Sequence, residues 1–162
     1  MNPNKQTVDI FSRIWSHDKL YKNKNRDIDI DRLSKWTDNN IWIWLEEVFS
    51  RNEITIIDNG CGIGYMFTNL LSAYPNDLPK IINYIGIDLI KDSKTNNFIN
   101  EWYASSKIKN STNLNIKIIS NDISNNIDYL NNCADLVIAW GSLHHTPDVN
   151  NALIQTFKYT KK

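Results

Sequence analysis

Three glycines at alternate positions, Gly60, Gly62 and Gly64, follow a carboxylate, Asp58, at the end of a short apolar run. Glycine has no Cβ, so its backbone can approach a ligand closely and can adopt a positive φ. A carboxylate beside such a turn repels a pyrophosphate and attracts a ligand that carries positive charge. These residue types at this spacing predict a binding site for a cationic, nucleotide-like ligand.

The spacing of the glycines differs from the dinucleotide-binding fingerprint. That fingerprint is G-x-G-x-x-G/A, and its third small residue lets the helix pack closely on the strand. Counted from Gly60, this position holds Tyr65, a bulky residue. Together with the carboxylate of Asp58, this argues against a nicotinamide-dependent oxidoreductase, which is kept only as a weak alternative.

Two further carboxylates stand at the ends of predicted strands. Asp88 ends the run 81–87, and Asp122 follows the run 114–120. In right-handed βαβ units these strand ends share one rim, so Asp88 should lie beside the glycine turn and accept ribose hydroxyls. Asp122 can accept a hydrogen bond from an exocyclic amine. The alternatives are a helix cap or surface position for Asp88, and a turn with Ser124 for Asp122.

Two adjacent histidines, His144 and His145, follow the fourth apolar run at 133–140. A neutral imidazole near pH 7 can take a proton from an acceptor molecule, so either one is a candidate general base. The alternative for each is a structural or partly exposed histidine. No cluster of metal ligands is evident in the sequence.

The pattern D-x-G-x-G-x-G from Asp58 resembles the first motif of class I S-adenosylmethionine-dependent methyltransferases. The pattern D-L-V-x-x-x-x-x-L-H-H-x-P-D from Asp135 to Asp148 resembles a further motif, common in small-molecule members. With the two intervening acids, four motifs lie in the family's order across residues 54–148. The resemblance implies transfer of a methyl group from S-adenosylmethionine to a small-molecule acceptor.

The resemblance also implies which residues bind the cofactor. Asp58 would lie near the methionine ammonium, with Gly60, Cys61, Gly62 and Gly64 forming the loop, Asp88 and Leu89 at the ribose, Asp122 and Ile123 at the adenine, and Trp140 and Gly141 at the methionine end.

The elements that must position these residues alternate between strand and helix. Apolar runs at 54–58, 81–87, 114–120 and 133–140 predict buried parallel strands. Segments 63–74, 92–108 and 149–159 have helical periodicity, and Asp148 can cap the last of them. The expected fold is an α/β, Rossmann-like three-layer sandwich with a mainly parallel sheet in the order 3-2-1-4.

The first fifty residues predict helices rather than strands. Residues 7–21 and about 38–50 have amphipathic spacing, and the aromatic run from Trp42 to Trp44 is interpreted as core packing. We therefore divide the chain into an N-terminal helical lid or cap, residues 1–50, and an S-adenosylmethionine-binding domain, residues 51–162. The resemblance implies that Phe11, Trp15 or Tyr21 could approach the ligand.

The chain departs from the family in length. Class I methyltransferases usually carry seven strands, whereas four are predicted here, so the C-terminal strands are missing. The fourth strand would then be an apolar edge, which invites pairing with another chain. We therefore expect either a fragment of a longer protein or a homodimer or partner chain that covers this edge. A non-catalytic cofactor-binding module, or a subunit of a larger assembly, is the alternative function.

Composition narrows the functional classes further. The 162 residues carry 18 basic and 18 acidic side chains, a formal net charge of +0, and no basic stripe, which argues against a nucleic-acid binder. No apolar run is long enough for a membrane span or a signal core. The two cysteines, Cys61 and Cys133, are interpreted as small buried thiols. The default expectation is a cytoplasmic protein.

Overall fold

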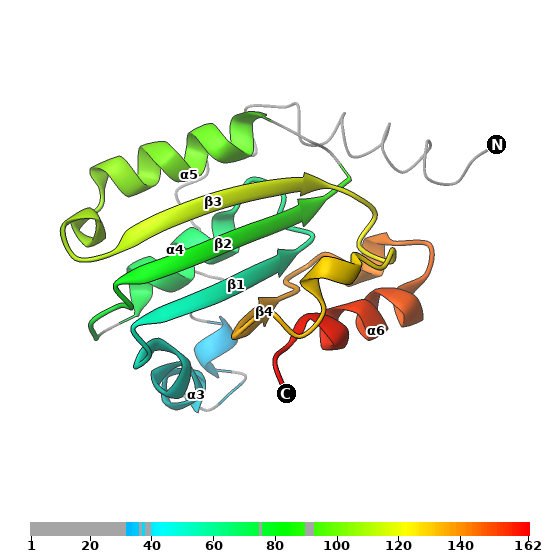
Figure 1. Cartoon of the computed structure of the whole chain (residues 1–162), viewed down its shortest axis with the longest axis horizontal. Coiled ribbons are helices and arrows are strands. Elements are labelled where there is room, and N and C mark those ends of the chain that lie inside the picture. The colour runs from blue at the N-terminus through cyan, green and yellow to red at the C-terminus, as the bar shows by residue number, and fades with distance from the viewer. Residues whose placement is uncertain (1–31, 36, 38–39, 75, 90–92) are drawn as a thin grey trace.

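The computed structural model describes residues 32–35, 37, 40–74, 76–89 and 93–162. Its centre is a four-stranded sheet in the order β3-β2-β1-β4, in which every neighbouring pair is parallel (Figure 1). The strands are β1 (Glu53–Asn59), β2 (Ile81–Asp88), β3 (Asn113–Ser120) and β4 (Leu136–Ile138). The predicted α/β class and strand order are confirmed.

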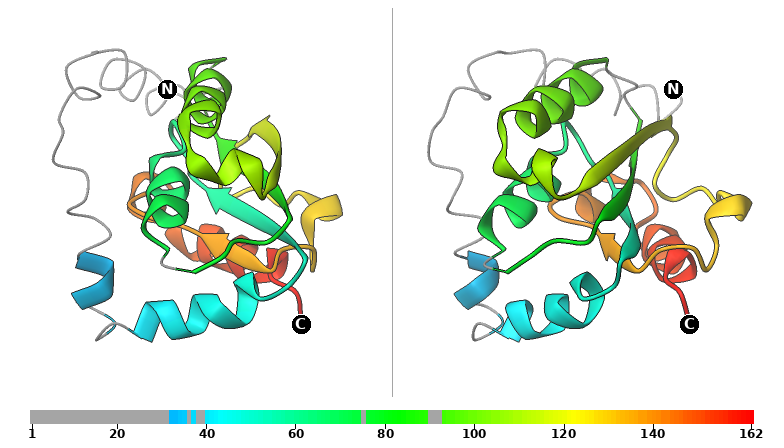
Figure 2. Two further views of the ribbon diagram at one scale, coloured as in Figure 1. Left: turned by 90° about the vertical axis from the view of Figure 1, so that its left-hand side faces the viewer. Right: turned by 60° about the vertical axis from the view of Figure 1, so that its left-hand side comes forward.

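Helices cover both faces of this sheet. The helices are α3 (Asn40–Phe49), α4 (Tyr65–Ala73), α5 (Ser93–Ser105) and α6 (Val149–Tyr159), with short 3-10 turns η1 (Lys107–Asn110), η2 (Asp128–Leu130) and η3 (Leu143–His145). One apolar core joins α3, α4 and α5 to the sheet, and a second joins α6 and η2 to its other face (Figure 2). This gives the expected three layers.

The alternation of side chains along β1 explains the two cores. Ile54 and Ile56 face α4 and α5, while Ile57 faces α6, and all three are at most 1% exposed. A strand covered on both faces needs apolar side chains on both, and these isoleucines supply them. Asp58 and Asn59 end the strand on opposite faces, which determines which helices each polar side chain can reach.

The fourth strand is shorter than the predicted 133–140. Its pairing with β1 begins at Leu136 and ends at Ile138, which lies opposite Asp58. Beyond that point the backbone amides of Gly60 and Cys61 donate to the carbonyl of Ile87 on β2, at 2.8 and 3.0 Å. The chain after β1 therefore turns toward β2, and its backbone forms no further strand pairing with β4.

The segment just before β4 pairs with the end of the chain, which the sequence analysis did not anticipate. Thr160, just after α6, forms an isolated parallel bridge with Ala134. The amide of Lys161 donates to the carbonyl of Ala134 at 2.8 Å, and the amide of Ala134 donates to the carbonyl of Tyr159 at 2.8 Å. The chain therefore pairs with itself beside the start of β4, whereas the sequence analysis expected pairing with a partner chain along β4.

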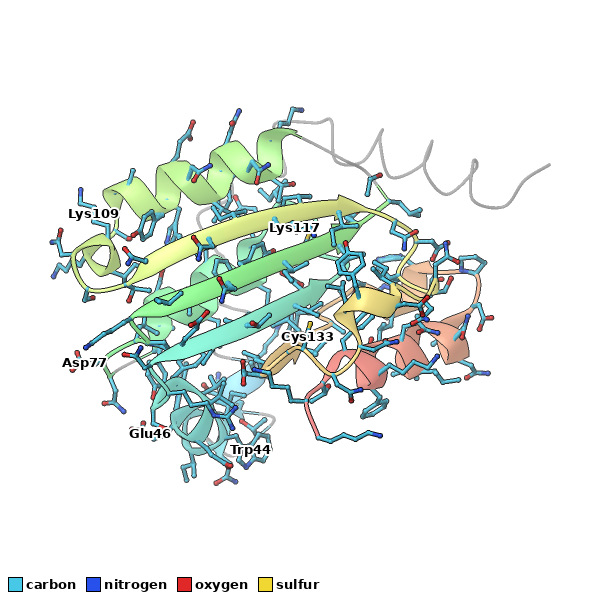
Figure 3. The ribbon with its side chains drawn as sticks, viewed as in Figure 1. Trp44, Glu46, Asp77, Lys109, Lys117 and Cys133 are labelled. Carbon is cyan, nitrogen blue, oxygen red and sulfur yellow. The ribbon has the colours of Figure 1, made fainter. Side chains whose placement is uncertain are left out.

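Helix α3 joins the main core through Leu45 and Phe49, which are 2% and 3% exposed. Trp42 packs against the same core, as predicted. The prediction was wrong for its neighbours, because Ile43 and Trp44 are 68% and 58% exposed. Figure 3 shows Trp44 on the outer side of α3. Three consecutive residues of a helix point in different directions, so an apolar run of this kind cannot all be buried on one face.

The predicted helix at residues 7–21, with Phe11, Trp15 and Tyr21, lies outside the described residues. Among the residues that the structure describes, no helix combines the length and the apolar character needed to cross a membrane.

Candidate functional site

The glycine turn is built at the C-terminal end of β1. Gly60, Gly62 and Gly64 have φ values of 90°, 51° and 86°, in the left-handed region. The amide of Gly64 donates to the carbonyl of Cys61 at 2.8 Å, which closes the turn, and α4 begins at the next residue. The helix therefore starts at Tyr65 and not at residue 63, because Gly64 is not helical.

Two of the loop glycines are required by close packing, and one is open. A Cβ on Gly60 would lie 2.1 Å from the Cβ of Ser142, and a Cβ on Gly64 would lie 2.6 Å from Ile99 Cδ1. A Cβ on Gly62 would meet nothing within 4 Å. The backbone at Gly62 thus borders open space, in which a ligand can contact it directly.

Asp88 lies beside this open glycine, as predicted. Its Oδ2 accepts a hydrogen bond from the amide of Gly62 at 2.9 Å. Thr95 of α5 donates its hydroxyl to the carbonyl of Gly62 at 2.8 Å. The next residue, Leu89, accepts a hydrogen bond at its carbonyl from the hydroxyl of Ser120, at 3.3 Å. The ends of β1, β2 and β3 are therefore tied together at one rim.

Asp122 makes the turn that was predicted as its alternative role. Its Oδ1 accepts from both the amide and the hydroxyl of Ser124, at 2.9 and 2.7 Å, and the side chain is 5% exposed. Ile123, between them, is buried in the core that faces α6. Asn151 of α6 donates to the carbonyl of Ser124 at 2.8 Å. This hydrogen bond ties the loop to α6.

The loop after β4 carries the remaining predicted residues. Trp140 is half-buried and packs against the main core. Gly141 has a φ of 66°, and a Cβ on this residue would meet nothing within 4 Å. Ser142 donates to the carbonyl of Asn59 at 2.6 Å, which ties this loop to the glycine turn. The topological switch point between β1 and β4 is the place where α/β folds bind ligands.

His144 and His145 are both exposed, and their ring centroids lie 3.7 Å apart. Desolvation, with a further contribution from His144, lowers the pKa of His145 below its ordinary value. At pH 7 His145 is therefore mostly neutral, the form that can accept a proton.

Comparison with known proteins decides the family. A family model described as a methyltransferase domain matches residues 29–162. The chain belongs to this methyltransferase domain family. The resemblance predicted from the glycine turn and the histidine motif is thus confirmed.

A solved structure shares the fold of this methyltransferase domain. It is a Methanococcus maripaludis protein provisionally assigned as an S-adenosyl-L-methionine-dependent methyltransferase, with a TM-score of 0.50 and 21% sequence identity. The match covers 87% of this chain and 62% of that protein, so the chain spans less than two thirds of that protein's length. No curated protein matches the chain.

In this methyltransferase domain the first acid of the glycine motif is buried beneath the loop. Asp58 is 2% exposed, and Tyr84 of β2 donates its hydroxyl to Asp58 Oδ2 at 3.1 Å. Desolvation raises the pKa of Asp58 to about 7; the Tyr84 hydrogen bond opposes this shift, and the charge of Asp88 adds to it. The carboxyl therefore changes its charge near neutral pH.

The first thiol, Cys61, belongs to the same buried group. A Cβ on Gly86 of β2 would lie 2.8 Å from the sulfur, so the thiol packs on that glycine. Burial first, and then the charges of Asp58 and Asp88, raise the pKa of Cys61 well above its ordinary value. The thiol is therefore protonated at neutral pH. Its burial agrees with the sequence analysis. Cys133 is only half-buried.

The residues present fit an adenosyl ligand by their chemistry. Carboxylates at Asp88 and Asp122 supply acceptors, and open backbone at Gly62 and Gly141 allows close approach. Within the described ranges, no group of three potential metal ligands occurs.

Sequence reasoning missed four residues that support this site: Tyr84, Thr95, Ser142 and Asn59. Tyr84 had a signal, because a tyrosine inside a buried strand usually needs a partner for its hydroxyl. The other three are common residues whose role appears only when distant segments meet.

Proposed function

We propose that this methyltransferase domain binds S-adenosylmethionine at the C-terminal rim of the sheet and transfers its methyl group to a small-molecule acceptor. The observation that supports the proposal is the hydrogen bond between the amide of Gly62 and the carboxylate of Asp88. The Gly62 amide fixes one carboxylate oxygen of Asp88 at 2.9 Å, beside open space over the glycine. A carboxylate held in place can accept two ribose hydroxyls without first losing side-chain entropy.

The other carboxylates have separate proposed roles. We assign Asp122 to the adenine amine, because Ser124 holds the carboxylate through Oδ1 alone. We assign Asp58 to the methionine ammonium, toward which its charge acts from beneath the loop. Cys61 and Ile123 shape the surrounding backbone, and Trp140 and Gly141 border the methionine end.

When bound, the cofactor supplies an electrophilic methyl group on a sulfonium. The protein's contribution is to align the acceptor with it and to exclude water. If the acceptor must lose a proton, His144 or His145 is the proposed base, and the lowered pKa of His145 keeps its ring neutral at pH 7. The balanced charge of the chain favours a small molecule over a nucleic acid.

Isothermal titration with S-adenosylmethionine and with its demethylated product tests binding. Asp88→Ala should weaken binding by about tenfold to a hundredfold, because two charge-assisted hydrogen bonds are lost. The matched control is Asp77→Ala, because Asp77 is exposed and lies at the opposite, N-terminal end of the strands (Figure 3). No binding by the unsubstituted protein would refute the proposal, and binding of NAD instead would favour an oxidoreductase.

A second candidate function is a binding module that holds the cofactor without catalysis. The exposure of both histidines favours it. Transfer of labelled methyl to a panel of small molecules separates the two candidates. Turnover that is lost in His144→Ala or His145→Ala supports catalysis by this chain, and tight binding without turnover supports the module.

A further inference from the structure

Ser142 precedes the short turn η3, at the position where a serine side chain commonly caps the turn that follows it. Its side chain makes no such hydrogen bond to η3. The hydroxyl donates instead to the carbonyl of Asn59 at the end of β1, 83 residues away in the sequence, at 2.6 Å. The side chain of Ser142 therefore joins two distant segments and does not stabilise its own turn.

The carbonyl of Asn59 lies where the pairing of β4 with β1 has ended. The last residue of β4 that pairs with β1 is Ile138, opposite Asp58, and Asn59 is the next residue of β1. Asn59 is 0% exposed, so its carbonyl needs a donor from within the protein. Ser142 supplies this donor and is itself only 8% exposed. Loss of the hydroxyl would leave a buried carbonyl without a partner.

Ser142 also contacts the residues on either side of this hydrogen bond. A Cβ on Gly60 would lie 2.1 Å from the Cβ of Ser142, so the serine packs directly on the first glycine of the turn. At its main chain, the carbonyl of Ser142 accepts a hydrogen bond from the amide of His145 at 3.0 Å. One residue therefore holds the glycine turn with its side chain and the histidine turn, residues 142–145, with its main chain.

We propose that Ser142 is a positioning residue that couples the glycine turn to the histidine turn, so that cofactor binding beside Gly62 orders the backbone at His145. This inference rests on the proposed function and adds how the candidate base is aligned with the cofactor. A displacement of about 1 Å in a reacting group can lower a rate by about a hundredfold, so the alignment of these two turns matters for catalysis.

A second connection from Asn59 leads to α6 and supplies a matched control. The side-chain amide of Asn59 donates to the hydroxyl of Thr156 at 2.9 Å. Thr156→Val removes a hydrogen-bond partner of Asn59, as Ser142→Ala does, but it leaves the contacts of Ser142 with both turns in place.

Hydrogen exchange at the amide of His145, followed by NMR, tests the coupling without a known acceptor. A saturating concentration of the demethylated cofactor should slow this exchange by about threefold or more, because a ligand that orders the glycine turn suppresses the opening of segments coupled to it. Ser142→Ala should abolish the slowing, and Thr156→Val should retain it. The amide of Thr112, just before β3 and at the opposite end of the sheet, is the internal reference. Slowing at His145 that persists in Ser142→Ala overturns the proposal.

Titration calorimetry on the same samples separates this inference from the proposed function. Absence of binding by the unsubstituted protein refutes the proposed function and this inference with it, whereas binding without slower exchange at His145 refutes the inference alone. Ser142→Thr keeps the hydroxyl and should restore the slowing, a rescue that lost packing would not explain. If Ser142→Ala does not fold, Ser142→Cys takes its place, because it keeps the volume and has a weaker donor.

Kinetics on any acceptor that the panel shows to be methylated provide a second readout. Ser142→Ala should lower kcat by about tenfold or more and change KM for S-adenosylmethionine by less than about threefold. The reason is that it releases the histidine turn but retains the hydrogen bond between Gly62 and Asp88. A loss that appears in KM alone would assign Ser142 to cofactor binding and contradict the positioning role.

Discussion

At the scale of single residues, the buried carboxyl of Asp58 stands out because its ionisation works against folding. The side chain is 2% exposed, and desolvation raises its pKa from 3.8 to about 7. In the unfolded chain the carboxyl ionises near its ordinary value. Between these two pKa values the unfolded state has lost a proton that the folded state retains, so stability falls as the pH rises from about 4 to 7.

Asp58→Asn should therefore stabilise the fold at pH 8 by up to about 4 kcal/mol, and should flatten the fall in stability between pH 4 and 7. The neutral amide can still accept the Tyr84 hydroxyl. Urea unfolding of both proteins at pH 4, 6 and 8 measures the difference, with Asp77→Asn as the exposed control. An equal effect of Asp58→Asn at all three pH values would contradict the raised pKa.

The loop glycines allow a second comparison at this scale. Gly62→Ala should retain the fold, because its Cβ meets open space and only the φ of 51° adds strain, roughly 1–2 kcal/mol. It should nevertheless weaken binding of S-adenosylmethionine, since the methyl group enters the space that we assign to the ligand. Gly60→Ala should destabilise the fold by more than about 3 kcal/mol, because its Cβ would overlap Ser142.

Thermal unfolding and calorimetry on the two glycine variants check this separation. A Gly62→Ala protein that binds as well as the original would place the ligand elsewhere.

At the scale of elements, the sequence predicted the positions of β1 to β3 better than any other part. All three lie where their apolar runs predicted, although β3, at the edge of the sheet, has only exposed and half-buried residues. The end of β4 was missed, since the turn of Gly60 toward Ile87 is a contact between segments far apart in sequence. The surroundings of Asp122 show the same division. Its turn with Ser124 could be predicted from neighbouring residues, but the hydrogen bond from Asn151 to this turn could not.

Helix α6 should therefore influence the adenine side of the site. Asn151→Ala removes the hydrogen bond to the carbonyl of Ser124, and we expect cofactor binding to weaken by about threefold to tenfold. The neighbouring, exposed Asn150 supplies the control variant, Asn150→Ala. Titration of S-adenosylmethionine into both variants decides, and equal affinities would show that α6 does not position this loop.

At the scale of the whole molecule, Asp135 joins three distant segments. Its carboxylate accepts from the amide of Thr55 at 2.8 Å and pairs with Arg51 at 2.5 Å and Lys161 at 2.7 Å. Burial alone would raise the pKa of Asp135, but the hydrogen bonds from Lys161 and Thr55 outweigh it and lower the pKa below 3.8. Such a group stabilises the fold above its unfolded pKa, and the contribution is lost as the pH falls.

Asp135→Asn should lower the free energy of unfolding by about 1–3 kcal/mol at pH 7. The loss is no larger because solvent screens the exposed lysine and arginine partners. The difference from the original protein should shrink as the pH falls below about 4, because the aspartate is then protonated as well. Urea unfolding at pH 3 and pH 7 measures both values. A penalty that is the same at both pH values would assign the role of Asp135 to packing and not to charge.

The sulfur of Cys61 packs on Gly86, so the accessibility of this thiol reports whether the glycine turn is closed on β2. A thiol-modifying reagent can reach the Cys61 sulfur only when the turn moves away from β2, so the rate at which Cys61 is labelled measures how often the loop opens. The half-buried Cys133 supplies an internal reference in the same sample. Any small molecule that stabilises the closed turn should slow the labelling of Cys61 and leave the labelling of Cys133 unchanged. Occupancy could then be followed in the native protein without a radiolabel, a tag or a known acceptor.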